Sequence, residues 1–234
     1  MSRTTLRVVL TPCAALDVGR LLAEAAALAR ALDAELAALV VEEADLLSCV
    51  ELPFTMEVGL VSGAVRPADP EATRRLLTRR AEQVRVLVAQ TAAGLGLSWS
   101  FEVARGDLLR EALSAAVAAP VVLAPPPSPA QQAVGRQPAP PAGGLVAVLA
   151  APRAADASEP GESAEPGQPG DGAWATAVRL AGGRADLVVR LRPEDLARGP
   201  APRALVVSLA SLRDRPGELE GVLAAAQCPV VLVR

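Results

Sequence analysis

The stretch RVVLTPCAALDVGRLLAEAAALARALDAELAALVVEE, residues 7–43, decides the fold. It opens with an apolar, β-branched run over 6–11 that stops at Pro12, as a buried strand does. From Asp17, a suitable N-cap, apolar residues recur at helical spacing, with charged side chains off that stripe. Residues 35–41 then form a second predicted strand, apolar enough for a parallel sheet covered on both faces. Strand, helix and strand together predict a βαβ unit.

The alternation of helices and strands continues to the end of the chain. Asp69-Pro70 starts a predicted helix that Gly94 stops. Further helices are predicted at 107–118, 173–180 and 217–226. Strands are predicted at 97–103, 120–124, 145–150, 185–191, 204–209 and 229–233. The pattern assigns no element to 42–67.

These elements predict an α/β protein of two Rossmann-like subdomains with parallel sheets, the second copy shortened. We place the first subdomain at 1–124 and the second, degenerate one at 144–234. The Pro- and Ala-rich segment 125–143 is predicted to link them. Residues at about 152–172 are rich in Pro, Gly, Ser and acidic side chains, and this loop is predicted to be disordered because it cannot bury enough apolar surface.

The composition excludes several classes of chemistry. None of the 234 residues is Lys, His, Tyr, Ile or Asn, so there is no imidazole base, no Schiff-base lysine and no P-loop lysine. Lys, Ile, Asn and Tyr have AT-rich codons, and we attribute their absence to a GC-rich genome. The formal net charge of -3 offers no basic surface for nucleic acid. Prolines break the longest uncharged stretch, 113–135, so we expect no membrane span.

The three cysteines indicate neither a metal site nor a disulfide framework. Cys13, Cys49 and Cys228 form no CxxC pair and have no histidine to complete a zinc site. We expect reduced, mostly buried thiols in a cytoplasmic protein. Cys13 follows a strand and precedes a helix, where a thiol pKa can fall and make the group redox-sensitive, but an inert buried thiol is the favoured interpretation.

Three segments resemble a known family, the universal stress proteins, in the tandem form that fuses two copies. Residues 7–43 resemble the family's first strand, helix and second strand. VARGDLLREAL at 103–113 is similar to its third strand, Gly-Asp turn and helix, and AQCPVVLVR at 226–234 is similar to its closing Cys-Pro-Val strand. The resemblance implies a role in stress response and a closing strand that pairs across a dimer interface.

The family's ATP-binding members hold the nucleotide at the carboxyl ends of the strands, and this chain departs from that pattern. The acidic residue that the resemblance implies after the first strand falls on Cys13, which cannot accept a ribose hydroxyl as a carboxylate does. The implied Gly-rich phosphate loop is replaced by PPPSPAQQAVGRQPAPPAGG at 125–144, and proline lacks the backbone N–H that such a loop needs. We therefore expect no ATP binding of useful affinity and no cofactor.

The remaining candidate for a ligand cleft is the ring of strand ends, with Thr11, Cys13, Val41, Gly106 and Asp107 as its residues. Each has a structural alternative. Thr11 and Cys13 can be turn and core residues without a ligand. Gly106 can be present for the backbone geometry of its turn, and Asp107 can be a helix N-cap. No catalytic residue and no metal ligand is predicted.

Two functions stay open at this point. The first is a non-catalytic regulatory or interaction protein of the universal-stress type; the second is a binding module for a nucleotide or small metabolite with a non-standard phosphate loop. We expect a protein partner or self-association, either as an intrachain pseudo-dimer or as a homodimer through the terminal strand from Pro229 to Val233, because an exposed strand edge needs a partner. The loop 52–63, with Phe54 and Met56, is predicted to pack over the strand ends or beneath the second copy; a lid or a partner-docking surface is the alternative.

Overall fold

The structure, a computed structural model, describes residues 4–12, 18–59, 62–125, 145–149, 172–196, 202–212, 216–226 and 228–234. Apart from Pro125 and Gly172, the predicted linker 125–143 and the predicted acidic loop 152–172 lie outside the described residues. Cys13 and Asp17 lie outside them as well. No helix in the described ranges combines the length and the apolar character that crossing a bilayer requires.

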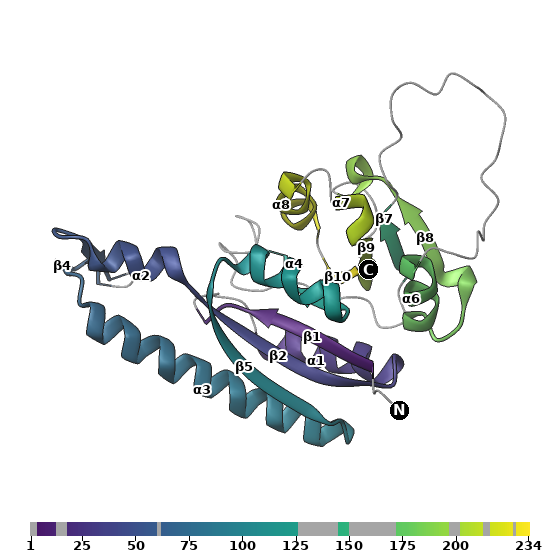
Figure 1. The fold of residues 1–234 in the computed structure, drawn as a ribbon, viewed down its shortest axis with the longest axis horizontal. Coiled ribbons are helices and arrows are strands. Elements are labelled where there is room, and N and C mark those ends of the chain that lie inside the picture. Colours follow the sequence, from purple (N-terminus) through teal and green to yellow (C-terminus); the bar gives the residue numbers. More distant parts are fainter. Residues whose placement is uncertain are drawn as a thin grey trace.

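A large, mostly parallel sheet forms the centre of the molecule (Figure 1). Within the described residues it has eight strands in the order β5-β2-β1-β6-β10-β9-β7-β8. Their bounds are β1 (Thr4–Leu10), β2 (Ala34–Glu43), β5 (Trp99–Gly106), β6 (Val121–Leu123), β7 (Val146–Leu149), β8 (Val188–Leu191), β9 (Ala204–Ser208) and β10 (Val230–Val233). Neighbouring strands are parallel except β6 and β10, which are antiparallel. Two parallel sets therefore meet at one antiparallel pair, and the α/β prediction is confirmed.

Helices cover both faces of this sheet. One face carries α1 (Val18–Ala31), α3 (Pro70–Leu95) and α6 (Gly172–Leu180). The other carries α4 (Leu108–Ala118), α7 (Leu209–Leu212) and α8 (Pro216–Ala225). Successive strand residues alternate between the two cores, as Val8 and Val9 do in β1. Both positions are apolar because both faces are buried, and each such side chain contributes about 1.5–3 kcal/mol through burial.

The predicted start of α3 is confirmed, whereas its predicted end is wrong. The side chain of Asp69 accepts hydrogen bonds from the backbone N–H groups of Glu71 and Ala72, at 2.9 and 3.1 Å, and Pro70 occupies the first turn. Gly94 lies inside the helix. Gly96 ends it in the left-handed region, at φ 65°, which glycine adopts without a Cβ clash.

Other boundaries also differ from the prediction. Residues 185–187 were expected to begin a strand but form the 3-10 turn η1 (Ala185–Leu187). The four residues of β8 pair with the four residues of β7, and within the described residues this pairing begins at Val188. A second 3-10 turn, η2 (Pro193–Asp195), follows β8. The unassigned stretch 42–67 contains α2 (Ala44–Glu51), β3 (Met56–Val58) and β4 (Val65–Pro67).

The terminal strand finds its partners within the chain. β10 pairs with β6 on one side and with β9 on the other. Both of its edges are thus hydrogen-bonded, and the expected alternative of a homodimer through this strand edge is wrong. Leu232 of β10 is fully buried in the core that also contains Leu123 of β6 and Leu205 of β9.

Truncating this central side chain tests how strongly the two parallel sets depend on each other. We expect Leu232→Ala to destabilise the protein by about 2–5 kcal/mol, because it leaves a cavity between the sets. Urea unfolding should still show one transition, since β10 is bonded to both sets. Val117→Ala on the exposed face of α4 serves as the control and should change stability by less than about 0.5 kcal/mol. If urea unfolding showed two transitions and Leu232→Ala lowered the midpoint of only one, the two parallel sets would be independent of each other.

Candidate functional site

The predicted site residues lie at the carboxyl edge of the first parallel set. Thr11 directly follows β1, and Val41 and Gly106 lie at or near the ends of β2 and β5. Asp107 comes next and caps α4. The parallel pairing of these strands places all four at the same edge of the sheet. Cys13, the fifth predicted residue, is outside the described part of the chain.

A small apolar hollow occupies this edge where β1 and β6 end. Its volume is about 30 Å³, comparable with the space of roughly one water molecule in the liquid. Thr11 supplies its polar side chain; the other lining residues are Val9, Leu10, Val18, Leu21, Leu108, Leu123 and Ala124. Ligand pockets for molecules of drug or cofactor size measure about 300–1,000 Å³, so this hollow is about tenfold too small for one.

Only Thr11 among the described candidates reaches that hollow. Val41 is fully buried and packs in the core that α4 covers. The Asp107 carboxylate accepts a hydrogen bond from the backbone N–H of Arg110 at 2.8 Å and so caps α4. A Cβ at Gly106 would lie 2.9 Å from Oε1 of Glu111, but this flexible side chain can move aside, so the approach does not by itself require glycine. This local geometry starts α4 at Leu108, whose side chain lines the hollow.

A buried carboxylate lies near the same edge but is paired. Glu42 is 7% exposed, and its Oε2 accepts a hydrogen bond from Nε of Arg105 at 3.0 Å. The two residues face each other across the β2–β5 register. The sequence prediction missed this pair because the register of two strands 63 residues apart is not visible in the chain. The pair thus joins a buried carboxylate to an Arg105 side chain that is 71% exposed.

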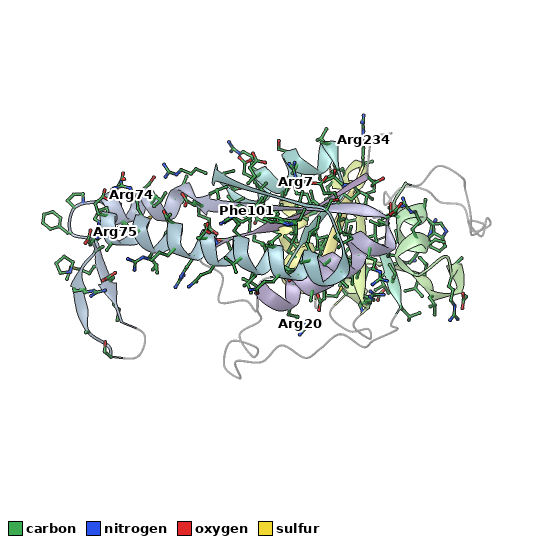
Figure 2. All side chains as sticks on the ribbon, turned by 90° about the horizontal axis from the view of Figure 1, so that it is seen from below. Arg7, Arg20, Arg74, Arg75, Phe101 and Arg234 are labelled. Atoms are coloured by element: carbon green, nitrogen blue, oxygen red, sulfur yellow. The ribbon has the colours of Figure 1, made fainter. Side chains whose placement is uncertain are left out.

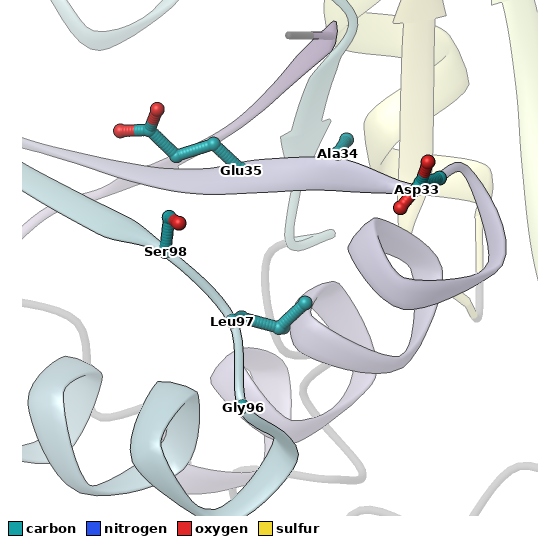
Figure 3. A pocket seen from close by; sticks show the side chains of 6 residues that line it. All are labelled: Asp33, Ala34, Glu35, Gly96, Leu97 and Ser98. Carbon is teal, nitrogen blue, oxygen red and sulfur yellow. The ribbon is translucent and has the colours of Figure 1, made fainter.

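A cavity larger than this hollow lies at the opposite edge, where β2 and β5 begin. It measures about 310 Å³ and is lined by Asp33, Ala34, Glu35, Gly96, Leu97 and Ser98. Figure 3 shows that the carboxylates of Asp33 and Glu35 lie at opposite ends of this opening and do not converge. In the described residues, no group of three or more Cys, Asp or Glu side chains is arranged to hold a metal ion. Sequence reasoning did not consider this edge because ligands of open α/β sheets usually bind at the other one.

The two described cysteines have opposite environments. Cys228 is buried between the strands and α8, and this burial, followed by the negative charge of Glu24, raises its pKa from the usual 9.0 to about 12. Cys49 is exposed on α2, so the prediction of mostly buried thiols is wrong for this residue. The sequence could not show that α2 stands away from the sheet.

No family model matches this chain, and no curated protein matches it either. The resemblance of residues 7–43 to the universal stress proteins therefore remains a prediction.

Thiol labelling tests the two environments. At pH 8, Cys49 should react with a maleimide within minutes, whereas Cys228 should react only after unfolding, because its thiol stays protonated and covered. Peptide mapping by mass spectrometry separates these two sites from Cys13, and Cys49→Ser is the matched control. Because the folded pKa is raised, stability should be unaffected below about pH 9 and should fall towards pH 12 as the unfolded thiol ionises first. Rapid labelling of native Cys228 would contradict the burial.

Proposed function

We propose that this chain is a cytoplasmic, universal-stress-type α/β protein that acts without catalysis, through contacts with other macromolecules, and does not use ATP. The small apolar hollow at the ends of β1 and β6 carries the proposal. A nucleotide in a protein of this type would lie at this edge, yet the hollow that Leu21, Leu108 and Leu123 line there measures only about 30 Å³. The prolines that follow β6 offer no backbone N–H groups to a phosphate.

The course of the two parallel sets supports the family and two-subdomain proposal. In the first set β1 lies between β2 and β6, and in the second β7 lies between β8 and β9. A helix connects β1 to β2, and another lies between β7 and β8. Within the described residues, the second set has no counterpart of β5 and the first has none of β10. The similar strand order supports a fused pair of copies, although each set has four described strands and the second is not shorter in strand number.

The side chains near the strand ends also favour a non-catalytic role. Glu42 is held in an ion pair with Arg105, and the Asp107 carboxylate is engaged as a helix cap. General acid–base catalysis needs a titratable group that is free to reach the substrate. Together with a composition that lacks His and Lys, these engaged carboxylates support binding rather than chemistry.

The second candidate is a nucleotide or small-metabolite module with a non-standard phosphate loop. One observation favours it. The chain runs from β1 to β2 on one side, and β6 later adds on the other side of β1, so the hollow with Thr11 lies at the topological switch point of the sheet. Ligands of open α/β sheets bind at such points.

Titration with Mg-ATP separates the two candidates. We expect no saturable heat in isothermal titration calorimetry and no rise of the melting temperature across a panel of nucleotides, because the hollow is too small for a base or a ribose. A ligand present at 100 times its Kd would stabilise the protein by about 2.7 kcal/mol, which a thermal shift resolves easily. Micromolar binding that Thr11→Val weakens would instead establish the binding module at the switch point. Binding that this variant leaves unchanged would place the ligand elsewhere.

A further inference from the structure

An arm extends away from the central sheet (Figure 1). We define it as α2, the β3–β4 hairpin and the first two turns of α3, that is, residues 44–59 and 62–76. Figure 2 shows Arg74 of the arm well apart from Phe101 of β5. The apolar face of the hairpin is exposed at Met56, Val58 and Val65. The predicted packing of loop 52–63 over the strand ends is therefore wrong. The hairpin is a separate two-stranded sheet, so it adds no strand to the edge of the central sheet at β5.

β5 forms one edge of the central sheet, and this edge lacks three common protections. Its pairing with β2 is continuous over all eight residues, without a bulge, and no proline interrupts it. At the opposite edge, β8 has only four residues, with the 3-10 turns η1 and η2 on either side. Very short edge strands, bulges and prolines keep a sheet from pairing with another chain. The structure has one of these devices at β8 and none of them at β5.

The backbone of β5 turns one row of hydrogen-bonding groups away from the sheet. The C=O of Ser98 accepts a hydrogen bond from the N–H of Leu36 at 3.0 Å, and this bond begins the ladder to β2. Successive residues of a strand turn their N–H and C=O groups to opposite sides, so the ladder uses residues 100, 102 and 104. The residues that turn both groups outward, which we call the outer row, are Trp99, Phe101, Val103 and Arg105. Within the described residues, no backbone group bonds to the outer row.

The side chains of the outer row add an apolar strip. Residues two apart share a face of the strand, and Phe101 packs against the core that α1 and α3 cover. In the part of the chain that the structure describes, no further strand continues this face, and Trp99 stays 36% and Val103 45% exposed. A strand laid against β5 would cover them with its own apolar side chains at alternate positions.

The opposite face of β5 selects the charge of the partner. Glu102 is exposed and forms no ion pair with a described residue. A second copy of β5 fits poorly, because the antiparallel register that bonds the whole outer row of both strands pairs Trp99 with Arg105 and places Glu102 opposite Glu102. Like charges directly opposed destabilise a strand pair, whereas opposite charges stabilise it. Glu102 therefore favours a strand with a basic side chain over a second copy.

We propose that β5 binds an extended segment of a partner protein as an additional strand of the central sheet. Backbone hydrogen bonds to the outer row hold the segment, its alternate apolar side chains cover Trp99 and Val103, and a Lys or Arg side chain faces Glu102. Such binding supplies contacts for the proposed non-catalytic role, but it depends only on the β5 edge. Nucleotide binding at the strand-end hollow would overturn the proposed function and leave this surface unaffected.

Amide hydrogen exchange measured by NMR tests this binding mode. The probe is the peptide acetyl-Thr-Val-Lys-Val-Thr-Val-Thr-amide, which alternates polar and apolar side chains. At saturating peptide, exchange at the amides of Trp99, Phe101 and Val103 should slow by about tenfold or more, because each gains a hydrogen bond. N-methylation of the three valines removes the N–H groups that face β5 and should abolish this protection. N-methylation of the lysine, whose N–H faces solvent, is the matched control and should preserve it.

Charge exchange tests the role of Glu102. Glu102→Lys should weaken binding of the lysine peptide by about two- to fivefold, and should strengthen binding of the same peptide with glutamate in place of lysine by a similar factor. Glu220 is exposed on α8, away from β5. Glu220→Lys makes the same charge change there and should alter neither affinity.

A pair of proline variants separates binding from folding. Val103→Pro removes an N–H of the outer row and leaves the ladder to β2 intact, so the protein should melt close to the wild type while the peptide no longer protects Trp99 and Phe101. Ala104→Pro removes an N–H that bonds to β2 and should lower the melting temperature by several degrees.

Three results would overturn the proposal. The first is an outer row that stays unprotected at millimolar peptide, or that the valine-methylated peptide protects equally. The second is protection that rises with protein concentration alone, which would identify a second copy as the occupant. The third is protection in the dilute wild type without peptide, which would identify a segment of this chain.

Discussion

The antiparallel pairing of β6 with β10 is the interaction on which the rest of the structure depends. β6 is only three residues long, and its two edges are bonded to β1 and β10. Through it the two parallel sets become one sheet, and the two cores run across both sets. The same pairing fixes Leu123, which lines the hollow in front of β1. The backbone N–H and C=O groups at both edges of β10 therefore find their hydrogen-bond partners within the chain.

Apolar side chains are buried at the carboxyl edge of the first parallel set but exposed on the β3–β4 hairpin. At the carboxyl edge of the sheet, leucines from α1, α4 and β6 line a hollow of about 30 Å³. On the arm, side chains of the same kind point into solvent. Hydrophobic burial is non-directional, so apolar side chains that are buried at the sheet and exposed on the arm differ only in what covers them.

Local patterns predicted much of this fold. The βαβ unit of residues 7–43 and the start of α3 at Asp69-Pro70 depend on periodicity and capping, which act within a few residues. The errors fall where distant contacts decide. Residues 185–187 form a 3-10 turn before the pairing of β8 with β7 begins, and Cys49 is exposed because α2 stands on the arm. The Glu42–Arg105 pair depends on strand register, which one chain segment cannot reveal.

By itself, the sequence determined the α/β class, the absence of imidazole and lysine chemistry, and the loss of the N–H groups that a phosphate loop after β6 would need. These follow from residue type and short-range spacing. The tertiary structure alone decided that β10 joins both sets, that the strand-end hollow measures only about 30 Å³, and that the hairpin displays its apolar face. Each of these depends on which surfaces meet in space. A period of two or 3.6 residues shows which apolar side chains share a face of a strand or helix, but not which surface will cover that face.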